Sequence, residues 1–134
     1  MHVAGFVNDN PMDVLDRHAV WAVVGWSPSP HRDSHRIAAL LERVGKTVIR
    51  VNPLATEHGA VPDLAAAGPV DVVDVFRRAD QAGAHVDEAI AHGAKAVWLQ
   101  LGVIDRAAAQ RARDAGLEVV MDDCPAIVLA RAGR

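Results

Sequence analysis

Hydrophobic residues along this chain gather in five short runs. The first, 19–25 (AVWAVVG), is continuously apolar and stops at a glycine. The others are 47–51 (TVIRV), 70–76 (VDVVDVF), 96–101 (AVWLQL) and 117–121 (LEVVM). Continuous apolar runs of this length are typical of strands that are covered on both faces, as in a parallel sheet. The pattern therefore predicts five parallel strands.

Apolar residues between these runs recur at helical spacing, and glycines follow several of the helical segments. The predicted helices are 11–17, with Asn10 as cap and Pro11 as first residue, one that begins at Ser34 and ends at Gly45, one that ends at Gly93, 106–115, and 125–130. Residues 53–69 are predicted to form a loop with one helical turn at 63–67. Strands and helices thus alternate along most of the chain.

Such alternation predicts an α/β fold of the Rossmann-like, three-layer type with a five-stranded parallel sheet. Counting the strands in chain order, we expect the sheet order 3-2-1-4-5. Asp71 and Asp74 interrupt the third strand and are expected near a sheet edge or at strand ends. Residues 1–134 are expected to form one domain, in which 1–18 is an N-terminal extension with a short helix.

The amino-acid composition and net charge limit the kinds of partner that this chain is expected to bind. The 134 residues are 51% hydrophobic, with a net charge of −3 and a pI near 6.1. No overall positive field would attract nucleic acid or an anionic membrane, so neither is expected as a partner. The chain has one cysteine, Cys124, and no apolar run of membrane-spanning length. A cytoplasmic location is expected, and Cys124 is expected to be a packed thiol.

The loop after the first strand is the strongest candidate for ligand binding, because it leads into a helix whose free N–H groups attract anions. Ser34 is the expected helix cap and Arg32 a mobile cation. Neither the G-x-G-x-x-G pattern nor the P-loop pattern is present. The candidate contacts in this loop are Gly25, Trp26, Ser27, Pro28, Ser29, Arg32 and Ser34. Trp26 could cover the ligand, whereas Trp98 is expected in the core.

The ends of the other strands add further candidates. Asn52 stands where NAD-binding proteins of this fold carry an acidic ribose anchor, which argues against NAD. Arg50 keeps NADP open as an alternative. Arg77 and Arg78 form an adjacent pair suited to clamping a phosphate. The remaining contacts are Pro53 and Phe76, which with Asn52 are expected at the adenosine end, and Gln100, Leu101 and Gly102, which close the other side of the crevice.

Several motifs together resemble the small stand-alone CoA-binding proteins, which are similar to the N-terminal domain of the succinyl-CoA synthetase α-subunit. They are G-x-S-P-x-P-x-R-x-S-x-R (Gly25–Arg36), V-N-P (Val51–Pro53), D-V-V-D-V-F-R-R (Asp71–Arg78), D-E-A-I-A-x-G-A-K (Asp87–Lys95), V-W-L-Q-L-G-V (Val97–Val103) and C-P-A-I (Cys124–Ile127). The resemblance covers about residues 11–131. It implies a Rossmann fold that holds coenzyme A across the strand ends. The segment after Pro53 looks shorter than the family pattern.

The resemblance also bears on activity. The synthetase subunit carries a second domain with a phosphorylated histidine, and the sequence here covers one domain, so ligase activity is not expected. A protein that binds coenzyme A or an acyl-CoA, without its own catalysis, is the leading interpretation. The alternatives are an NADP-dependent reductase, disfavoured by the lack of tyrosine, and a nucleotide-sensing regulatory subunit that acts through a partner. A protein partner or homo-oligomer stays open. His31 and His35 are too few for a metal site.

Overall fold

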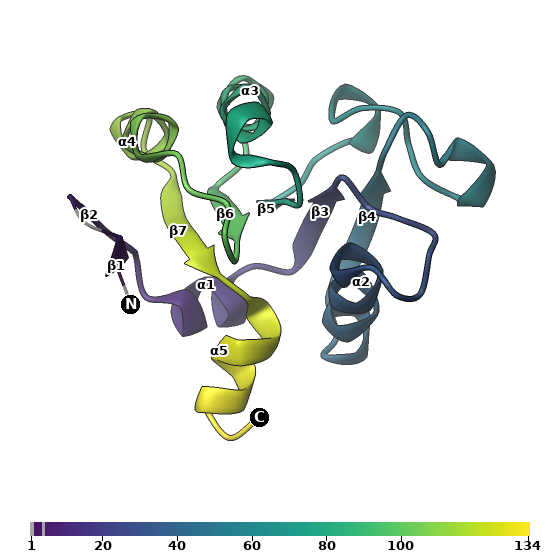
Figure 1. Ribbon diagram of the computed structural model, residues 1–134, viewed down its shortest axis with the longest axis horizontal. Helices are drawn as coiled ribbons and strands as arrows, with labels where there is room; N and C mark the ends of the chain where they lie inside the picture. The colour runs from purple at the N-terminus through teal and green to yellow at the C-terminus, as the bar shows by residue number, and fades with distance from the viewer. Residues whose placement is uncertain (1, 4) are drawn as a thin grey trace.

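The computed structural model describes residues 2–3 and 5–134, and Figure 1 shows its arrangement. The strands are β1 (His2–Val3), β2 (Phe6–Val7), β3 (Val20–Val24), β4 (Thr47–Val51), β5 (Val72–Val75), β6 (Ala96–Gln100) and β7 (Glu118–Asp123). The helices are α1 (Pro11–Arg17), α2 (Asp33–Arg43), α3 (Ala79–His92), α4 (Arg106–Asp114) and α5 (Pro125–Arg131). Two 3-10 turns, η1 (Thr56–His58) and η2 (Ala65–Ala67), lie between β4 and β5.

The main sheet has five strands in the order β4-β3-β5-β6-β7, and every neighbouring pair is parallel. The predicted α/β Rossmann-like class is therefore confirmed. The predicted strand order is wrong, because β5 pairs with β3 and not with β4. Counted as in the sequence, the order is 2-1-3-4-5. The strand order thus reverses between β3 and β5, and ligands of open α/β sheets bind at such a switch point.

Helices cover both faces of the sheet, which explains why its strands are apolar on both sides. α1, α2 and α5 lie on one face and α3 and α4 on the other (Figure 1). The first face buries the indoles of Trp21 and Trp98, which contact each other at a tilt of 52° with their ring centroids 5.6 Å apart. The second face packs alanine-rich helices against the sheet, through residues such as Ala82, Ala89 and Ala112. Trp98 lies in the core as predicted.

The N-terminal segment supports the edge of the sheet at β7. β1 and β2 form a small antiparallel hairpin that the sequence pattern did not reveal. The Asn8 side chain pairs with both backbone groups of Met121, and Asp9 accepts from the Val119 N–H at 2.7 Å. Asn10 caps α1 as predicted. These side chains replace part of the missing neighbour strand and protect an exposed sheet edge.

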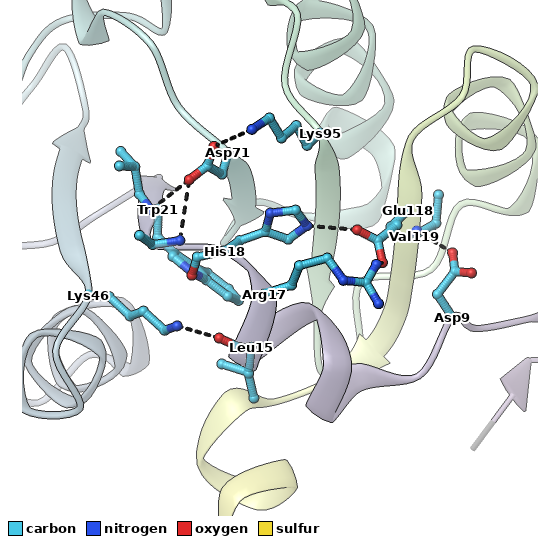
Figure 2. A network of polar contacts seen from close by, with 12 residues as sticks. Asp9, Leu15, Arg17, His18, Trp21, Lys46, Asp71, Lys95, Glu118 and Val119 are labelled. Carbon is cyan, nitrogen blue, oxygen red and sulfur yellow. Dashed lines mark hydrogen bonds and ion pairs between the residues drawn. The ribbon is translucent and has the colours of Figure 1, made fainter.

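Polar contacts tie the amino ends of the strands together. Figure 2 shows His18 against Glu118, with Nε2 and Oε1 2.7 Å apart, and Asp71 bound by Lys95. Asp71 also accepts from the Ala19 and Val20 N–H groups. Asp71 therefore lies just before β5, as expected for a residue at a strand end.

Asp74 is not at an edge or a strand end, contrary to the sequence-based expectation. It is fully buried inside β5, in register with Val23 on one side and Trp98 on the other. Neither carboxyl oxygen has a hydrogen-bond partner among the described residues. Burial raises the pKa of the Asp74 carboxyl well above its usual value. The physical reason is that an unpaired carboxylate is costly in an apolar core, so burial favours the protonated form.

No helix among residues 2–3 and 5–134 has both the length and the apolar composition that crossing a bilayer requires.

We predict that Asp74 makes the protein less stable as pH rises. Its folded-state pKa is raised, so the unfolded state releases its proton first, from about pH 4 upward. The free energy of unfolding of wild type should fall, relative to that of Asp74→Asn, by about 1.4 kcal/mol per pH unit until the folded-state pKa is reached. Urea unfolding across this range measures the difference.

Asp71 supplies a control of opposite sign. Its partial burial favours a higher pKa, but hydrogen bonds from Val20 N–H, Lys95 and Ala19 N–H together lower the pKa. Asp71 should therefore stabilise the fold above its unfolded-state pKa and lose that contribution as pH falls.

The outcome that would contradict the Asp74 prediction is a free energy of unfolding that changes with pH in the same way in wild type and in Asp74→Asn. Such parallel curves would show that the Asp74 carboxyl is ionised in the fold.

Candidate functional site

The site lies where the chain leaves β3 at the switch point. Gly25 has φ +85° and donates its N–H to the Val51 carbonyl at 2.9 Å. A Cβ at Gly25 would stand 2.4 Å from the Phe76 carbonyl oxygen and 3.1 Å from Arg77 Cδ. Only glycine permits this backbone approach between the loops after β3 and β5. Two adjoining cavities open at this point, and both include Gly25, Asn52 and Arg77.

One cavity, here called the polar half, has a volume of about 460 Å³. It runs from the start of α2 to the end of β6. Its lining residues are Gly25, Ser27, Arg32, Asp33, Ser34, Asn52, Phe76, Arg77, Gln100, Leu101 and Val103. Backbone N–H groups at a helix start, with two arginines, make this half suited to an anionic group.

Ser34 does not cap α2, contrary to the prediction. The cap position is Arg32, which makes no side-chain capping hydrogen bond. The Ser34 hydroxyl instead accepts from the Ser27 N–H at 2.9 Å and so holds the loop against the helix. The reason is that the loop folds back over the first turn, which places Ser34 one residue inside the helix. The side chain of the cap residue therefore accepts no hydrogen bond from the N–H groups in the first turn of α2.

Charges around the start of α2 also favour an anion. The backbone of Arg32 is hydrogen-bonded, with its N–H donating to the Ser29 carbonyl, but its guanidinium has no hydrogen bond or ion pair within the described chain. Asp33 carries the carboxylate nearest the polar half, and Arg36 binds it while also donating to the His31 carbonyl. Arg77 lines the cavity and donates to Gln81 Oε1 at 2.6 Å. The local balance is thus positive although the whole chain is acidic.

The other cavity, here called the apolar half, has a volume of about 390 Å³. It lies between β4, the segment after it and α3. The apolar lining residues are Val24, Val51, Pro53, Leu54, Pro62 and Leu64. Asp63, His85 and Glu88 add polar atoms, and His85 Nδ1 lies 2.7 Å from Glu88 Oε1. An apolar pocket with a few polar groups suits a heterocyclic base.

Asn52 joins the two halves and is already engaged by the fold. Its Nδ2 donates to the Trp26 carbonyl at 2.7 Å, and its Oδ1 accepts from the Leu54 N–H at 2.9 Å. The indole of Trp26 is buried, stacks on His35 and lies under the Arg50 guanidinium. Trp26 is therefore packed beneath the loop rather than laid over it.

Arg50 does not line either half among the described residues. Its guanidinium makes two hydrogen bonds to the Glu42 carboxylate, at 2.7 and 3.1 Å. The hydrogen bond from Arg50 is the main cause that lowers the pKa of the Glu42 carboxyl. This pairing leaves Arg50 poorly placed to bind a ribose phosphate.

The end of β6 forms the far wall of the polar half. Gln100 is only 6% exposed, and its Oε1 lacks a hydrogen-bond partner in the described part of the chain. Gly102 donates its N–H to Asp122 Oδ1 at 2.7 Å. Asp122 has φ +59° and adjoins the irregular register between β6 and β7. An aspartate tolerates this left-handed conformation better than most residues, and here it fixes the wall.

Most of the residues predicted from the sequence meet in this groove. Those that line its two halves are Gly25, Ser27, Arg32, Ser34, Asn52, Pro53, Phe76, Arg77, Gln100 and Leu101. Phe76 was expected at the adenosine end, but it lines the polar half and not the apolar half. Arg78 lines a neighbouring cavity with Gln81, and its guanidinium pairs with Asp80. Trp26, Pro28, Ser29 and Gly102 lie outside the lining of both halves.

Sequence reasoning missed other lining residues. His85 and Glu88 come from the middle of α3, where nothing in the helical pattern marks them as pocket residues. Residues 62–64 approach the pocket because Val61 forms a parallel bridge with Val51 beside β4. His31 and His35 form no metal cluster, since no group of three or more potential ligands occurs among the described residues.

A parallel sheet with a polar and an apolar half-site at its switch point is the arrangement typical of nucleotide-binding α/β domains. Residues 19–130 match the model of the CoA binding domain. The chain is 34% identical over 116 residues to the uncharacterized protein YneT of Bacillus subtilis, covering 84% of this chain and 86% of YneT. The protein therefore belongs to the CoA binding domain family.

Solved structures agree with this assignment. A hypothetical protein from Pyrococcus horikoshii superposes with a TM-score of 0.87 at 31% identity, covering 98% of this chain and 95% of its own. A Thermus thermophilus protein, cell-free ID.343, gives a TM-score of 0.82 at 31% identity, covering 90% and 94% respectively. The similarity thus extends over the whole fold.

We predict that Gly25→Ala destabilises the protein more than Gly45→Ala does. Both glycines have positive φ, so both substitutions cost about 1 kcal/mol in backbone strain. Only at Gly25 does the new Cβ collide with backbone, whereas nothing lies within 4 Å of a Cβ at Gly45. The collision should cost about 1–3 kcal/mol more in free energy of unfolding, measured in urea. Equal costs would mean that the two loops separate easily.

Proposed function

We propose that this protein binds coenzyme A in the groove at the switch point and has no catalytic activity of its own. The observation that carries the proposal is the continuity of the polar and apolar halves through Gly25, Asn52 and Arg77. A nucleotide with a pyrophosphate needs such a pair of sites side by side. Family membership supports coenzyme A as that nucleotide.

In this binding mode the pyrophosphate lies at the start of α2. The first-turn N–H groups, Ser27 and Arg32 would contact its oxygens, because a helix start attracts phosphate and Arg32 is not paired elsewhere within the described residues. The adenine enters the apolar half, where Pro53 and Leu64 offer flat apolar contacts. The pantetheine arm then leaves toward β6.

The 3′-phosphate of the ribose needs a cation near the junction of the two halves. Arg77 lines both halves, and its Cδ lies close to Gly25. Arg78 is mostly exposed and pairs with Asp80. The placement of these side chains supports Arg77 as the phosphate partner and leaves Arg78 as a solvated helix-start charge.

A purely binding role is supported by how the serine hydroxyls near the pyrophosphate position are used. The hydroxyls of Ser27 and Ser34 both accept from backbone N–H groups. The nearby imidazole of His35 contacts the Ser27 carbonyl, with Nδ1 and O 3.1 Å apart, rather than a hydroxyl. Nucleophilic catalysis needs a base in contact with the nucleophile, and this arrangement does not provide one.

We predict that coenzyme A stabilises the fold and NAD does not. The Asn52 side chain is bound to backbone groups on both sides and offers no carboxylate for the NAD ribose. Coenzyme A at about 100 times its Kd should add about 2.7 kcal/mol, which raises the Tm by several degrees. Thermal melts with coenzyme A, NAD, NADP and free pantetheine make the comparison. A Tm that rises with NAD but not with coenzyme A would refute the proposal.

We predict that Arg77→Ala removes the preference for coenzyme A over dephospho-CoA. A charge-assisted hydrogen bond contributes about 1.5–3 kcal/mol, so wild type should favour coenzyme A about ten- to a hundredfold. Arg78→Ala is the matched control and should keep that preference, because Arg78 lies outside both halves. Calorimetric titration of both ligands into the three proteins measures it. If Arg78→Ala lost the preference and Arg77→Ala kept it, Arg78 and not Arg77 would be the partner of the 3′-phosphate.

A further inference from the structure

A second groove continues from the polar half and runs between α2 and α5. Its volume is about 480 Å³. It shares Asp33, Gln100 and Leu101 with the polar half, so the two hollows meet at the end of β6. The other lining residues are Arg36, Ile37, Leu40, Arg43, Cys124, Ala126 and Ile127. Apart from Gln100 and the charged residues of α2, the lining is apolar.

Gln100 stands at the boundary between the two hollows. It is 6% exposed, and its Oε1 finds no partner in the described part of the fold. A buried acceptor without a donor costs free energy, which a ligand N–H group would recover. Hydrogen-bond donors are therefore expected in whatever passes Gln100 from one hollow to the other.

The rim of the groove carries apolar side chains that the fold does not bury. Leu101 is 52% exposed and Ile127 is 40% exposed, and they come from the β6 end and from α5. Folding gains little from either side chain in this position. An apolar ligand chain lying between them would remove both from water.

We propose that the groove between α2 and α5 binds the pantetheine arm and an apolar acyl chain, so that the ligand is an acyl thioester of coenzyme A rather than the free thiol. This inference rests on the proposed function. With the adenine in the apolar half and the pyrophosphate at the start of α2, the arm leaves toward Gln100. The two amide N–H groups of the arm are donors for Gln100 Oε1. The acyl chain then lies along Leu40, Leu101 and Ile127.

The test is how affinity depends on acyl length. Coenzyme A and its acetyl, butyryl and octanoyl thioesters are titrated into wild type. Each methylene buried in the groove should raise affinity about two- to fourfold, so octanoyl-CoA should bind at least tenfold more tightly than butyryl-CoA. Equal affinities for all thioesters, with coenzyme A still binding, would overturn this inference alone. Binding of none of the ligands would instead refute the proposed function.

Two matched variants locate the acyl chain. Ile127→Asp places a charge in the groove and should flatten the dependence on acyl length. Ile104 is 41% exposed, like Ile127, but does not line the groove, so Ile104→Asp should keep the dependence. Thermal melts establish that both variants fold. An unchanged dependence in a folded Ile127→Asp would place the acyl chain elsewhere and overturn the inference.

The single cysteine gives an independent readout. Cys124 is half-buried and lines the groove, so its alkylation reports whether the groove is occupied. Saturating octanoyl-CoA should slow alkylation by iodoacetamide several-fold. Adenosine 3′,5′-bisphosphate, which lacks the arm, should leave the rate unchanged. Equal rates with and without octanoyl-CoA would show that the arm does not enter the groove.

Discussion

The close backbone approach of Gly25 to Phe76 is the constraint on which the site depends. β3 lies between β4 and β5, and the helices that follow β3 and β5 go to opposite faces of the sheet. The loops therefore diverge directly above this contact and leave a groove between them. A side chain at Gly25 would reach the Phe76 carbonyl and Arg77, and Arg77 lines both halves. The absence of one Cβ thus sets the depth of the groove.

Internal hydrogen bonds prepare the groove for a negatively charged ligand. The serine hydroxyls and Asn52 hold the loop after β3, and Arg36 binds the Asp33 carboxylate. Arg32 and the N–H groups at the start of α2 are left facing the polar half. A chain with a net charge of −3 can in this way present a locally positive site. Apart from Ser27, the groups that hold the loop are distinct from the groups that would contact the ligand, so binding does not require rebuilding the loop.

Buried polar atoms without a hydrogen-bond partner occur in two different settings among the described residues. Asp74 is fully buried in the core, where burial raises the pKa of its carboxyl, whereas Gln100 lies at the boundary of two hollows. A missing hydrogen-bond partner therefore has different consequences at Asp74 and at Gln100. At Asp74 it is a cost in stability that depends on pH. At Gln100 it marks a position where a ligand can supply the missing donor.

The sequence by itself determined the alternation of strands and helices, because hydrophobic periodicity and glycine stops are local. It also identified ten residues that line the groove, since residues that follow parallel strands meet at one edge. Strand order, the position of Asp74 and the role of Ser34 were decided only by the tertiary structure. Pairing β5 with β3 depends on how the crossovers pack, and no local pattern records it. His85 and Glu88 join the pocket for the same reason, because the packing of α3 places them there.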